Sequence, residues 1–264
     1  DEKGAKMSKS KGNYVEPKSI LNSQGADALR WYFLSGVQPW NSLRFSERAV
    51  AMASKDFLIK LRNVFQFFLI YARIDGFDPA RGGSAGIASA RPSTWGEHAG
   101  RRPPAERSAL DRWMLGELAL TIRTVREALD AYDSFRASQA LAELVEGLSN
   151  WYLRRSRNRF WGSGLEQDKL DAYWTLYEAL STIALLVAPF TPFVAEELYQ
   201  RLVRAAWPAS APASVHLDEY PSSEEFPVDE RLARGMALAR EAAALGRAAR
   251  AEAKLKVRMP LSEA

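Results

Sequence analysis

A chain of 264 residues that is 47% hydrophobic and 26% charged has the size and composition of a globular protein with one large or two smaller domains. No apolar run reaches the roughly 18 residues of a membrane span, and the absence of cysteine excludes thiolate metal sites and fits a reducing, cytoplasmic compartment. The net charge of +4 is uneven: residues 231–258 hold eight basic residues against two acids, while residues 216–230 hold six acids and no Lys or Arg. Such segregation favours local contact with an anion.

The first quarter of the chain is predicted to hold a loop and short helices. Residues 1–16 are expected to form a loop, and Glu16 and Pro17 open a short helix. Residues 27–34 are too apolar for a surface helix, so we expect a buried helix that ends at Gly36. Ser46 is expected to cap the next helix, in which apolar residues recur at spacings of three and four up to about Tyr71.

The remainder is predicted to form further amphipathic helices. Residues 75–105 are rich in Gly, Pro, Ser and Arg, which indicates a mobile surface connection. Helices are expected at about 106–131, 134–160, 168–187, 192–206 and 229–253, with Asp133 and Thr191 as caps and a possible strand at Val215–Leu217. Helices joined mostly by short connections predict a mainly α fold, an antiparallel helical bundle.

Residues 6–10, with the sequence Lys-Met-Ser-Lys-Ser, form the most distinctive local pattern. Lysine acts as a point charge on phosphoryl oxygens, and hydroxyl and backbone N–H groups donate to the same oxygens. Gly12 and Asn13 follow and predict a turn. This composition is typical of a triphosphate-binding loop, and a solvated chain end is the alternative that five residues alone leave open.

Longer stretches extend this pattern. Residues 6–17 and 25–35 resemble the segment that leads class I aminoacyl-tRNA synthetases from the catalytic domain into the tRNA-binding helices, and the pentapeptide at 6–10 resembles their KMSKS signature. The runs at 148–161, 188–198, 214–221 and 256–261 are similar to the isoleucyl branch of that family in particular. The resemblance covers nearly the whole chain except residues 76–105.

For the loop, the resemblance implies a role in amino-acid activation, in which it closes over ATP while pyrophosphate leaves. It assigns Lys6 and Lys9 as catalytic residues and implies that ATP, with Mg²⁺, is bound by Lys6, Met7, Ser8, Lys9 and Ser10. The partner signature His-x-Gly-His has no match in this chain. We therefore expect activity in an intact parent enzyme, none in this portion alone, no bound cofactor or metal here, and any zinc site in other parts of the parent.

The helix predicted at 134–160 has an arginine-rich face suited to an RNA loop, because a guanidinium group offers both charge and a stacking plane. The resemblance makes the anticodon arm the expected target. Ion pairs with acids of neighbouring helices are the alternative for each arginine, and covering the helix end is the alternative to base stacking for the tryptophan. The candidate contacts are Asn150, Arg154, Arg155, Arg157, Asn158, Arg159 and Trp161.

The end of the chain provides a second candidate surface for tRNA. The phosphate backbone is the expected target, and a solvated helix end is the alternative. The basic residues concerned are Arg247, Arg250, Lys254, Lys256 and Arg258.

As partners, the resemblance implies tRNA(Ile), together with ATP and isoleucine through a catalytic domain outside this chain, and it implies a monomeric parent without membrane contact. It divides the chain into the end of a catalytic domain (1–46), an anticodon-binding helical bundle (47–227) and a basic helix (228–264). Two alternatives remain: a valyl or leucyl sister enzyme, and a helical protein-interaction bundle without RNA binding. The last would bind its partner without sensitivity to salt.

Overall fold

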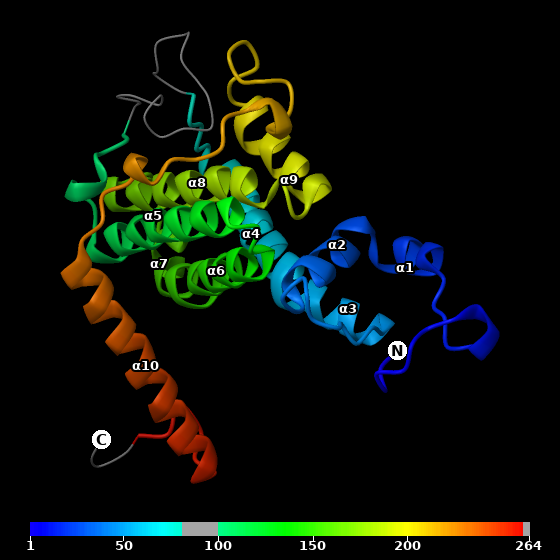
Figure 1. Ribbon diagram of the computed structural model, residues 1–264. Coiled ribbons are helices and arrows are strands. Elements are labelled where there is room, and N and C mark those ends of the chain that lie inside the picture. Colours follow the sequence, from blue (N-terminus) through cyan, green and yellow to red (C-terminus); the bar gives the residue numbers. More distant parts are fainter. Residues whose placement is uncertain (81–99, 261–264) are drawn as a thin grey trace.

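The computed structural model describes residues 1–80 and 100–260 (Figure 1). These ranges contain no strand, which confirms the predicted mainly α fold. Residues 81–99, within the predicted surface connection, lie outside the described residues. The α-helices are α1 (Pro17–Gln24), α2 (Ala26–Ser35), α3 (Glu47–Ser54), α4 (Lys60–Asp75), α5 (Ala109–Asp130), α6 (Ser134–Glu146), α7 (Arg154–Trp161), α8 (Gln167–Val187), α9 (Pro192–Tyr199) and α10 (Glu230–Glu252).

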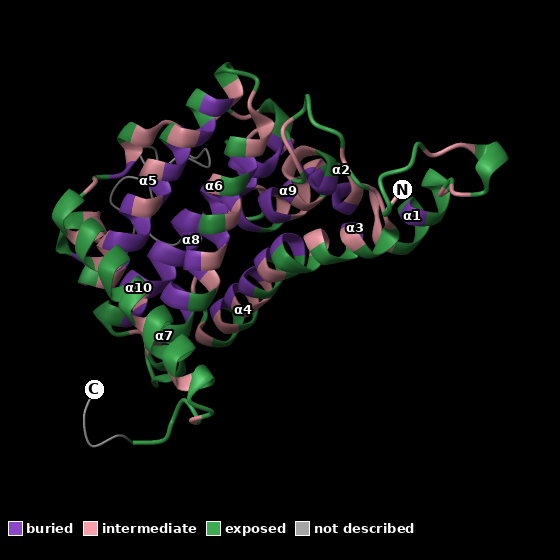
Figure 2. Ribbon diagram, turned by 60° about the horizontal axis from the view of Figure 1, so that its bottom comes forward, coloured by how far each residue is buried: buried purple, intermediate pink, exposed green. Residues whose placement is uncertain are grey.

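Helix α8 forms the centre of the bundle. Every residue from Asp171 to Val187 is buried, as expected for a helix that is covered on all sides. Helices α4, α5, α7 and α9 pack around it, and α6 packs against α5. Figure 2 shows the buried residues gathered on the inner faces of these helices, with the outer face of α7 and nearly all of α10 exposed. The core therefore lies between α4, α5, α6 and α8.

Charged residues inside this core are paired. Glu178 on α8 accepts two hydrogen bonds of 2.8 Å from the Arg107 guanidinium, and both side chains are fully buried. Asp171, about two turns before Glu178 on α8, is paired with Arg102. A buried charge is tolerated only when a partner offsets its lost hydration. These pairs fasten the segment that precedes α5 to the central helix.

Three of the predicted helices are continuous but contain π-helical segments, and in one of them α9 passes into Gln200–Arg204. The helix that begins with α3 passes through a π-helical turn at Lys55–Ile59 into α4, and α6 passes through Gly147–Leu153 into α7. Two of the predicted caps are confirmed: the Ser46 hydroxyl accepts from the Ala49 N–H, and the Asp133 carboxylate accepts from the Arg136 N–H. A π-helical segment shifts the face that the following turns present.

The structure departs from the local predictions at four places. Val215–Leu217 forms a 3₁₀ turn rather than a strand, because the Ser214 hydroxyl accepts from the His216 N–H and closes the turn. Thr191 occupies the N-cap position of α9, but its hydroxyl donates to the Val187 carbonyl instead of capping the helix. The predicted loop at 1–16 contains a 3₁₀ turn at Lys9–Lys11, and the helix expected from 106 begins at Ala109, capped by Ser108.

Helix α10 projects away from the bundle at its far end (Figure 1). None of its residues is buried, and its start is fixed by the Asp229 carboxylate, which accepts from the Leu232 N–H at 2.9 Å. The indole N–H of Trp151 points to the Met236 sulfur at 3.1 Å, which holds the first half of α10 against the bundle. Among the described helices, none combines the length and the apolar character that crossing a membrane requires.

Candidate functional site

The lysine-rich loop at 6–10 is held in shape by Asn13. The Asn13 side chain accepts from the Ser8 N–H at 3.0 Å and donates to the Lys6 carbonyl at 3.3 Å, so it binds the first half of the loop. Gly12 closes the 3₁₀ turn in the left-handed conformation, with φ of 65°, which glycine adopts without a steric penalty. The turn predicted at Gly12 and Asn13 is thus present, and it is tied to the loop by side-chain bonds.

The cations of this loop face solvent. Lys6, Lys9 and Ser10 are exposed, and Met7 and Ser8 are half-buried. The Ser8 and Ser10 hydroxyls lie 3.2 Å apart, and the Lys9 ammonium lies 5.7 Å from the centre of the Tyr14 ring. Two exposed ammonium groups beside a pair of hydroxyls form a donor set that fits phosphoryl oxygens.

The outer face of the helix predicted at 134–160 carries the arginines expected there. Asn150, Arg154, Arg157 and Asn158 are exposed, whereas Leu148, Trp151 and Tyr152 are buried, as the helical spacing indicated. Within the described part of the chain, no hydrogen bond or ion pair engages Arg154 or Arg157. Their guanidinium groups are therefore available to an external anion.

Arg154 of the first predicted basic surface and Arg247 of the second line the same cleft. A cleft of about 540 Å³ lies between the end of α6, the start of α7 and the middle of α10. Arg154 lines one wall, and Arg240 and Arg247 line the other. Glu146 and Glu241 also line it, but Glu146 is paired with Lys60 and accepts from Asn150 at 2.5 Å. Among the described residues Glu241 forms no ion pair, and three arginines outnumber it, so the cleft is electropositive.

Arg155 lies beside this cleft and stacks on a tryptophan. Its guanidinium carbon is 3.1 Å from the centre of the Trp151 ring, a cation–π contact that holds the side chain flat against the helix. Partial burial, together with the positive charges of Arg154, Arg247 and Arg240, lowers the pKa of Arg155. This lowered pKa reflects the concentration of positive charge at the junction of α7 and α10.

Arg159 and Trp161 are placed differently from the other candidates. The Arg159 guanidinium donates to both carboxylate oxygens of Asp111 at 2.8 Å and to Asp168 at 2.9 Å, and 14% of its side chain is exposed. Its donors are directed into the protein. Trp161 is 58% exposed, but its indole N–H donates to the Tyr71 hydroxyl at 2.8 Å, which ties the end of α7 to α4.

The candidates after Arg247 lie at the far end of α10. The Arg250 guanidinium donates to the carbonyls of Lys256 and Met259 at 3.1 and 2.8 Å, so it folds the following residues back on the helix. Lys254 is exposed in a left-handed conformation with φ of 56°, and Lys256 and Arg258 are exposed beyond it. These cations are separated from the cleft and form the tip of the projecting helix.

One residue of the cleft, Arg240, was missed by the sequence reasoning. It lies seven residues before Arg247 and therefore on the same side of α10, and its guanidinium also lies 5.5 Å from the Trp113 ring of α5. The signal that identifies it is this seven-residue spacing, which is about two helical turns.

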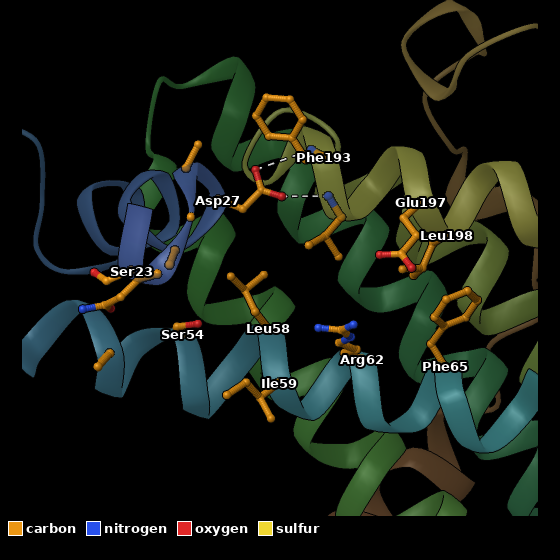
Figure 3. A pocket seen from close by; sticks show the side chains of 16 residues that line it. Ser23, Asp27, Ser54, Leu58, Ile59, Arg62, Phe65, Phe193, Glu197 and Leu198 are labelled. Atoms are coloured by element: carbon orange, nitrogen blue, oxygen red, sulfur yellow. Dashed lines mark hydrogen bonds between the residues drawn. The ribbon is translucent and has the colours of Figure 1, made fainter. Parts of the chain in front are cut away.

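A larger cavity, of about 710 Å³, lies between α2, α9 and the helix formed by α3 and α4 (Figure 3). Leu58, Phe65 and Leu198 provide apolar walls, and Asp27 and Arg62 provide charge. None of the predicted site residues lines it. It is separate from the loop at 6–10 and from the cleft between α7 and α10.

Two known families match this chain. The family described as "Anticodon-binding domain of tRNA ligase" matches residues 111–264, and the family described as "tRNA synthetases class I (I, L, M and V)" matches residues 1–46. The first match contains α5 to α10 and thus both walls of the arginine cleft. The second contains the loop at 6–10, α1 and α2.

Whole proteins resemble this chain in sequence, and solved structures resemble it in fold. Isoleucine–tRNA ligases of Dehalococcoides mccartyi and Clostridium novyi are 45% and 42% identical over the full chain, which spans about a quarter of their length, 24% and 23%. A leucyl-tRNA synthetase structure from Agrobacterium radiobacter, solved with tRNA, matches 88% of this chain and 23% of its own with a TM-score of 0.57 at 21% identity. Methionyl-tRNA synthetase from Mycobacterium tuberculosis matches 86% of this chain and 42% of its own, with a TM-score of 0.55 at 21% identity. The fold is thus that of these enzymes' helical regions, and the chain belongs to the family of anticodon-binding domains of tRNA ligases.

Proposed function

We propose that this chain is the portion of an isoleucine–tRNA ligase that holds the anticodon arm of tRNA(Ile) and carries the loop that contacts ATP. The geometry that supports this most directly is the electropositive cleft between α7 and α10, whose Arg154 and Arg247 face each other across it. Cations of this kind neutralise phosphates, and planar guanidinium groups stack on unpaired bases. The identity of 45% with an isoleucine–tRNA ligase over the full chain supports the choice of isoleucine over valine or leucine.

Within this proposal, the exposed outer face of α7 and the cleft form one tRNA-binding surface. Asn150, Arg154, Arg155, Arg157 and Asn158 contribute from the bundle, and Arg247 contributes from α10. Arg250 and Lys254 extend it toward the tip of the helix, where the phosphate backbone is the target. Trp161 offers its exposed ring at the end of α7. Arg159 takes part indirectly, since its ion pairs orient α7.

The loop at 6–10 has the donors that the γ- and β-phosphates of ATP require. Lys6 and Lys9 would neutralise charge that develops on the phosphoryl oxygens during activation, and Ser8 and Ser10 would donate hydrogen bonds to them. ATP, as its Mg²⁺ complex, would supply the α-phosphorus that the isoleucine carboxylate attacks, so that the aminoacyl adenylate forms and pyrophosphate leaves. The domain division proposed is 1–46 for the end of the catalytic domain, 47–227 for the bundle and 228–264 for the basic helix. We also propose a monomeric, cytoplasmic parent enzyme.

A gel-shift titration with tRNA(Ile) tests the binding surface. We expect the affinity of the chain to fall steeply between about 50 and 200 mM salt, because the arginines release counterions from phosphates. The charge reversal Arg154→Glu with Arg157→Glu should lower the affinity at least about tenfold, whereas Arg123→Glu with Arg62→Glu, on exposed sites away from the cleft, should have a smaller effect. Equal losses from both pairs, or salt-insensitive binding, would exclude this surface.

The loop is tested separately in the full-length ligase. Lys9→Ala should lower the rate of isoleucine-dependent ATP–pyrophosphate exchange by about 10²–10³-fold, because one positioned donor to the transition state is lost. Arg48→Ala, an exposed cation close to the loop, serves as the control and should change the rate little. Exchange that survives in Lys9→Ala would show that the loop does not contact ATP.

A further inference from the structure

One face of α2 is directed at the corner between α8 and α9. Asp27, Arg30 and Trp31 are spaced three and four residues apart and therefore share that face. The corner that they meet contains Pro189 and Pro192 and lies about 160 residues away along the chain. The sequence singled out both stretches, yet neither belongs to the loop at 6–10 or to the arginine cleft.

Arg30 binds the carboxyl end of α8. Its guanidinium donates to the Pro189 carbonyl at 2.7 Å and to the Phe190 carbonyl at 3.0 Å. These carbonyls follow the last turn of α8, where a helix has partial negative charge and carbonyl groups without partners inside the helix. A cation with two diverging donors suits this position.

Asp27 binds the amino end of α9. Its carboxylate accepts from the Val194 N–H at 2.7 Å and from the Phe193 N–H at 3.4 Å, as Figure 3 shows. The helix's own N-cap residue, Thr191, leaves these donors free. Asp27 therefore supplies the missing cap from another helix. It does so at 7% exposure, and burial raises its pKa although the two backbone N–H groups and Arg30 oppose that shift.

Trp31 fills the space between these two polar contacts. Its ring stacks on Phe57 at a centroid distance of 3.6 Å and meets the edge of Phe190 at 6.0 Å. The other end of α2 is bonded to α6, where the Gln139 amide donates to the Ser35 carbonyl at 3.3 Å. Helix α2 is thus bonded at both ends to the bundle, and α1 and the loop at 6–10 precede it directly in the chain.

From this arrangement we infer that Asp27 and Arg30 are positioning residues that fix the orientation of the ATP-contacting loop relative to the helices that hold tRNA. This inference rests on the proposed function. It assigns to the pair a role in the transfer of isoleucine to tRNA, in which both regions must act together. It assigns no role in the activation of isoleucine, which uses the loop and the rest of the catalytic domain but not the helices that hold tRNA. The two residues act through helix ends and touch no substrate.

The test uses the full-length ligase that contains this chain. Asp27→Asn keeps the shape of the side chain but presents an amide to the α9 N–H groups, and Arg30→Met keeps the length of the side chain without its donors. We expect kcat for charging of tRNA(Ile) to fall about 10- to 100-fold, because small misplacements of reacting groups have effects of that size. ATP–pyrophosphate exchange and the KM for tRNA should stay within about twofold of wild type.

Graded and matched variants make the result specific. Arg30→Lys keeps the charge with a single donor direction and should restore part of the lost kcat. Asp56→Asn and Arg123→Met alter exposed residues of the same types elsewhere and should leave charging unchanged. Arg30 is itself exposed, so its replacement leaves no internal void even where Asp27→Asn disturbs folding.

Two outcomes would overturn the inference. One is unchanged charging in both Asp27→Asn and Arg30→Met, and the other is a parallel loss of exchange, charging and melting temperature, which a purely structural role would produce. Failure of the proposed function looks different, because the wild-type enzyme itself would then neither charge nor bind tRNA(Ile).

Discussion

Arg157 and Arg159 lie two residues apart on α7, and their surroundings are opposite. Arg157 faces solvent on the outer side of the helix, whereas Arg159 is mostly buried on the inner side and bonded to Asp111 of α5 and Asp168 of α8. The Asp111 carboxylate is fully buried and also accepts from the Tyr152 hydroxyl at 2.6 Å. One arginine-rich run therefore serves two purposes, because among the described residues acids form ion pairs with Arg159 and not with Arg154 or Arg157.

This contrast shows that an arginine count does not measure RNA-binding capacity. The inner side of α7 uses its charge to fasten three helices together, and only the outer side leaves charge for a ligand. The same division holds for Arg107, which is buried against Glu178, and Arg247, which lines the open cleft. Four measurements would break or sharpen the comparison.

The largest effect is expected from Arg159→Met. Removing the guanidinium leaves the Asp111 carboxylate buried without a charged partner, which typically costs about 3–5 kcal/mol of unfolding free energy. Arg157→Met, on the outer side, should change the free energy by less than about 0.5 kcal/mol. Urea unfolding of the chain measures both. Similar losses in the two variants would contradict the division of α7 into an inner and an outer side.

The pH dependence of stability should differ between wild type and Arg159→Met. Burial alone would raise the pKa of Asp111, but hydrogen bonds and charge attraction from Arg159, aided by Tyr152 and Ser108, hold it below the ordinary value of 3.8. A carboxyl group with a lowered pKa stabilises the fold above that ordinary value and loses the contribution as the pH falls through its folded pKa.

In Arg159→Met the Asp111 carboxyl group stays buried but loses the Arg159 guanidinium, so its pKa should rise. A group with a raised pKa favours the fold at low pH, so the variant should be more stable in acid than at neutral pH. The advantage of wild type should therefore shrink as the pH is lowered from about 7 to about 3. Unfolding titrations at several pH values measure this difference. An advantage that stays constant would mean that Asp111 titrates alike in both proteins.

In the cleft between α7 and α10, Arg247→Ala should affect tRNA binding and leave folding unchanged. We expect the slope of log affinity for tRNA(Ile) against log salt to decrease by about 0.7–0.9 if the guanidinium neutralises one phosphate. The free energy of unfolding should change by less than about 0.5 kcal/mol, because the side chain is exposed. Arg234→Ala, earlier on α10, is the matched control. An unchanged slope would remove α10 from the binding surface.

The smallest effect is expected at the border between the two sides. Trp161→Phe removes the hydrogen bond of 2.8 Å to the Tyr71 hydroxyl and should destabilise the chain by about 0.5–1.5 kcal/mol. Because a phenyl ring still stacks on a base, tRNA affinity should fall less than in Trp161→Ala. Equal affinities of the two variants would show that the ring contacts no base.

Local signals were sufficient for most of the fold. The caps at Ser46 and Asp133 and the spacing of apolar residues predicted helices close to their observed positions. They failed at Thr191, because the donors that it was expected to satisfy bind instead to Asp27, which lies 166 and 167 residues away from them along the chain. A distant cap leaves no trace in the local pattern, and the same holds for the cleft, whose two walls come from α7 and α10.

The amino-acid sequence by itself determined where helices begin and end, which of their faces are apolar, and that the loop at 6–10 carries lysines and hydroxyl groups, since these properties depend on neighbours within a few turns. The tertiary structure decided which cations remain available. Arg159 meets an acid 48 residues away, while Arg154 and Arg247 approach each other across open space. The physical reason is that the charge available to a ligand depends on which groups the packed helices bring within hydrogen-bonding distance, and that is a property of the whole fold.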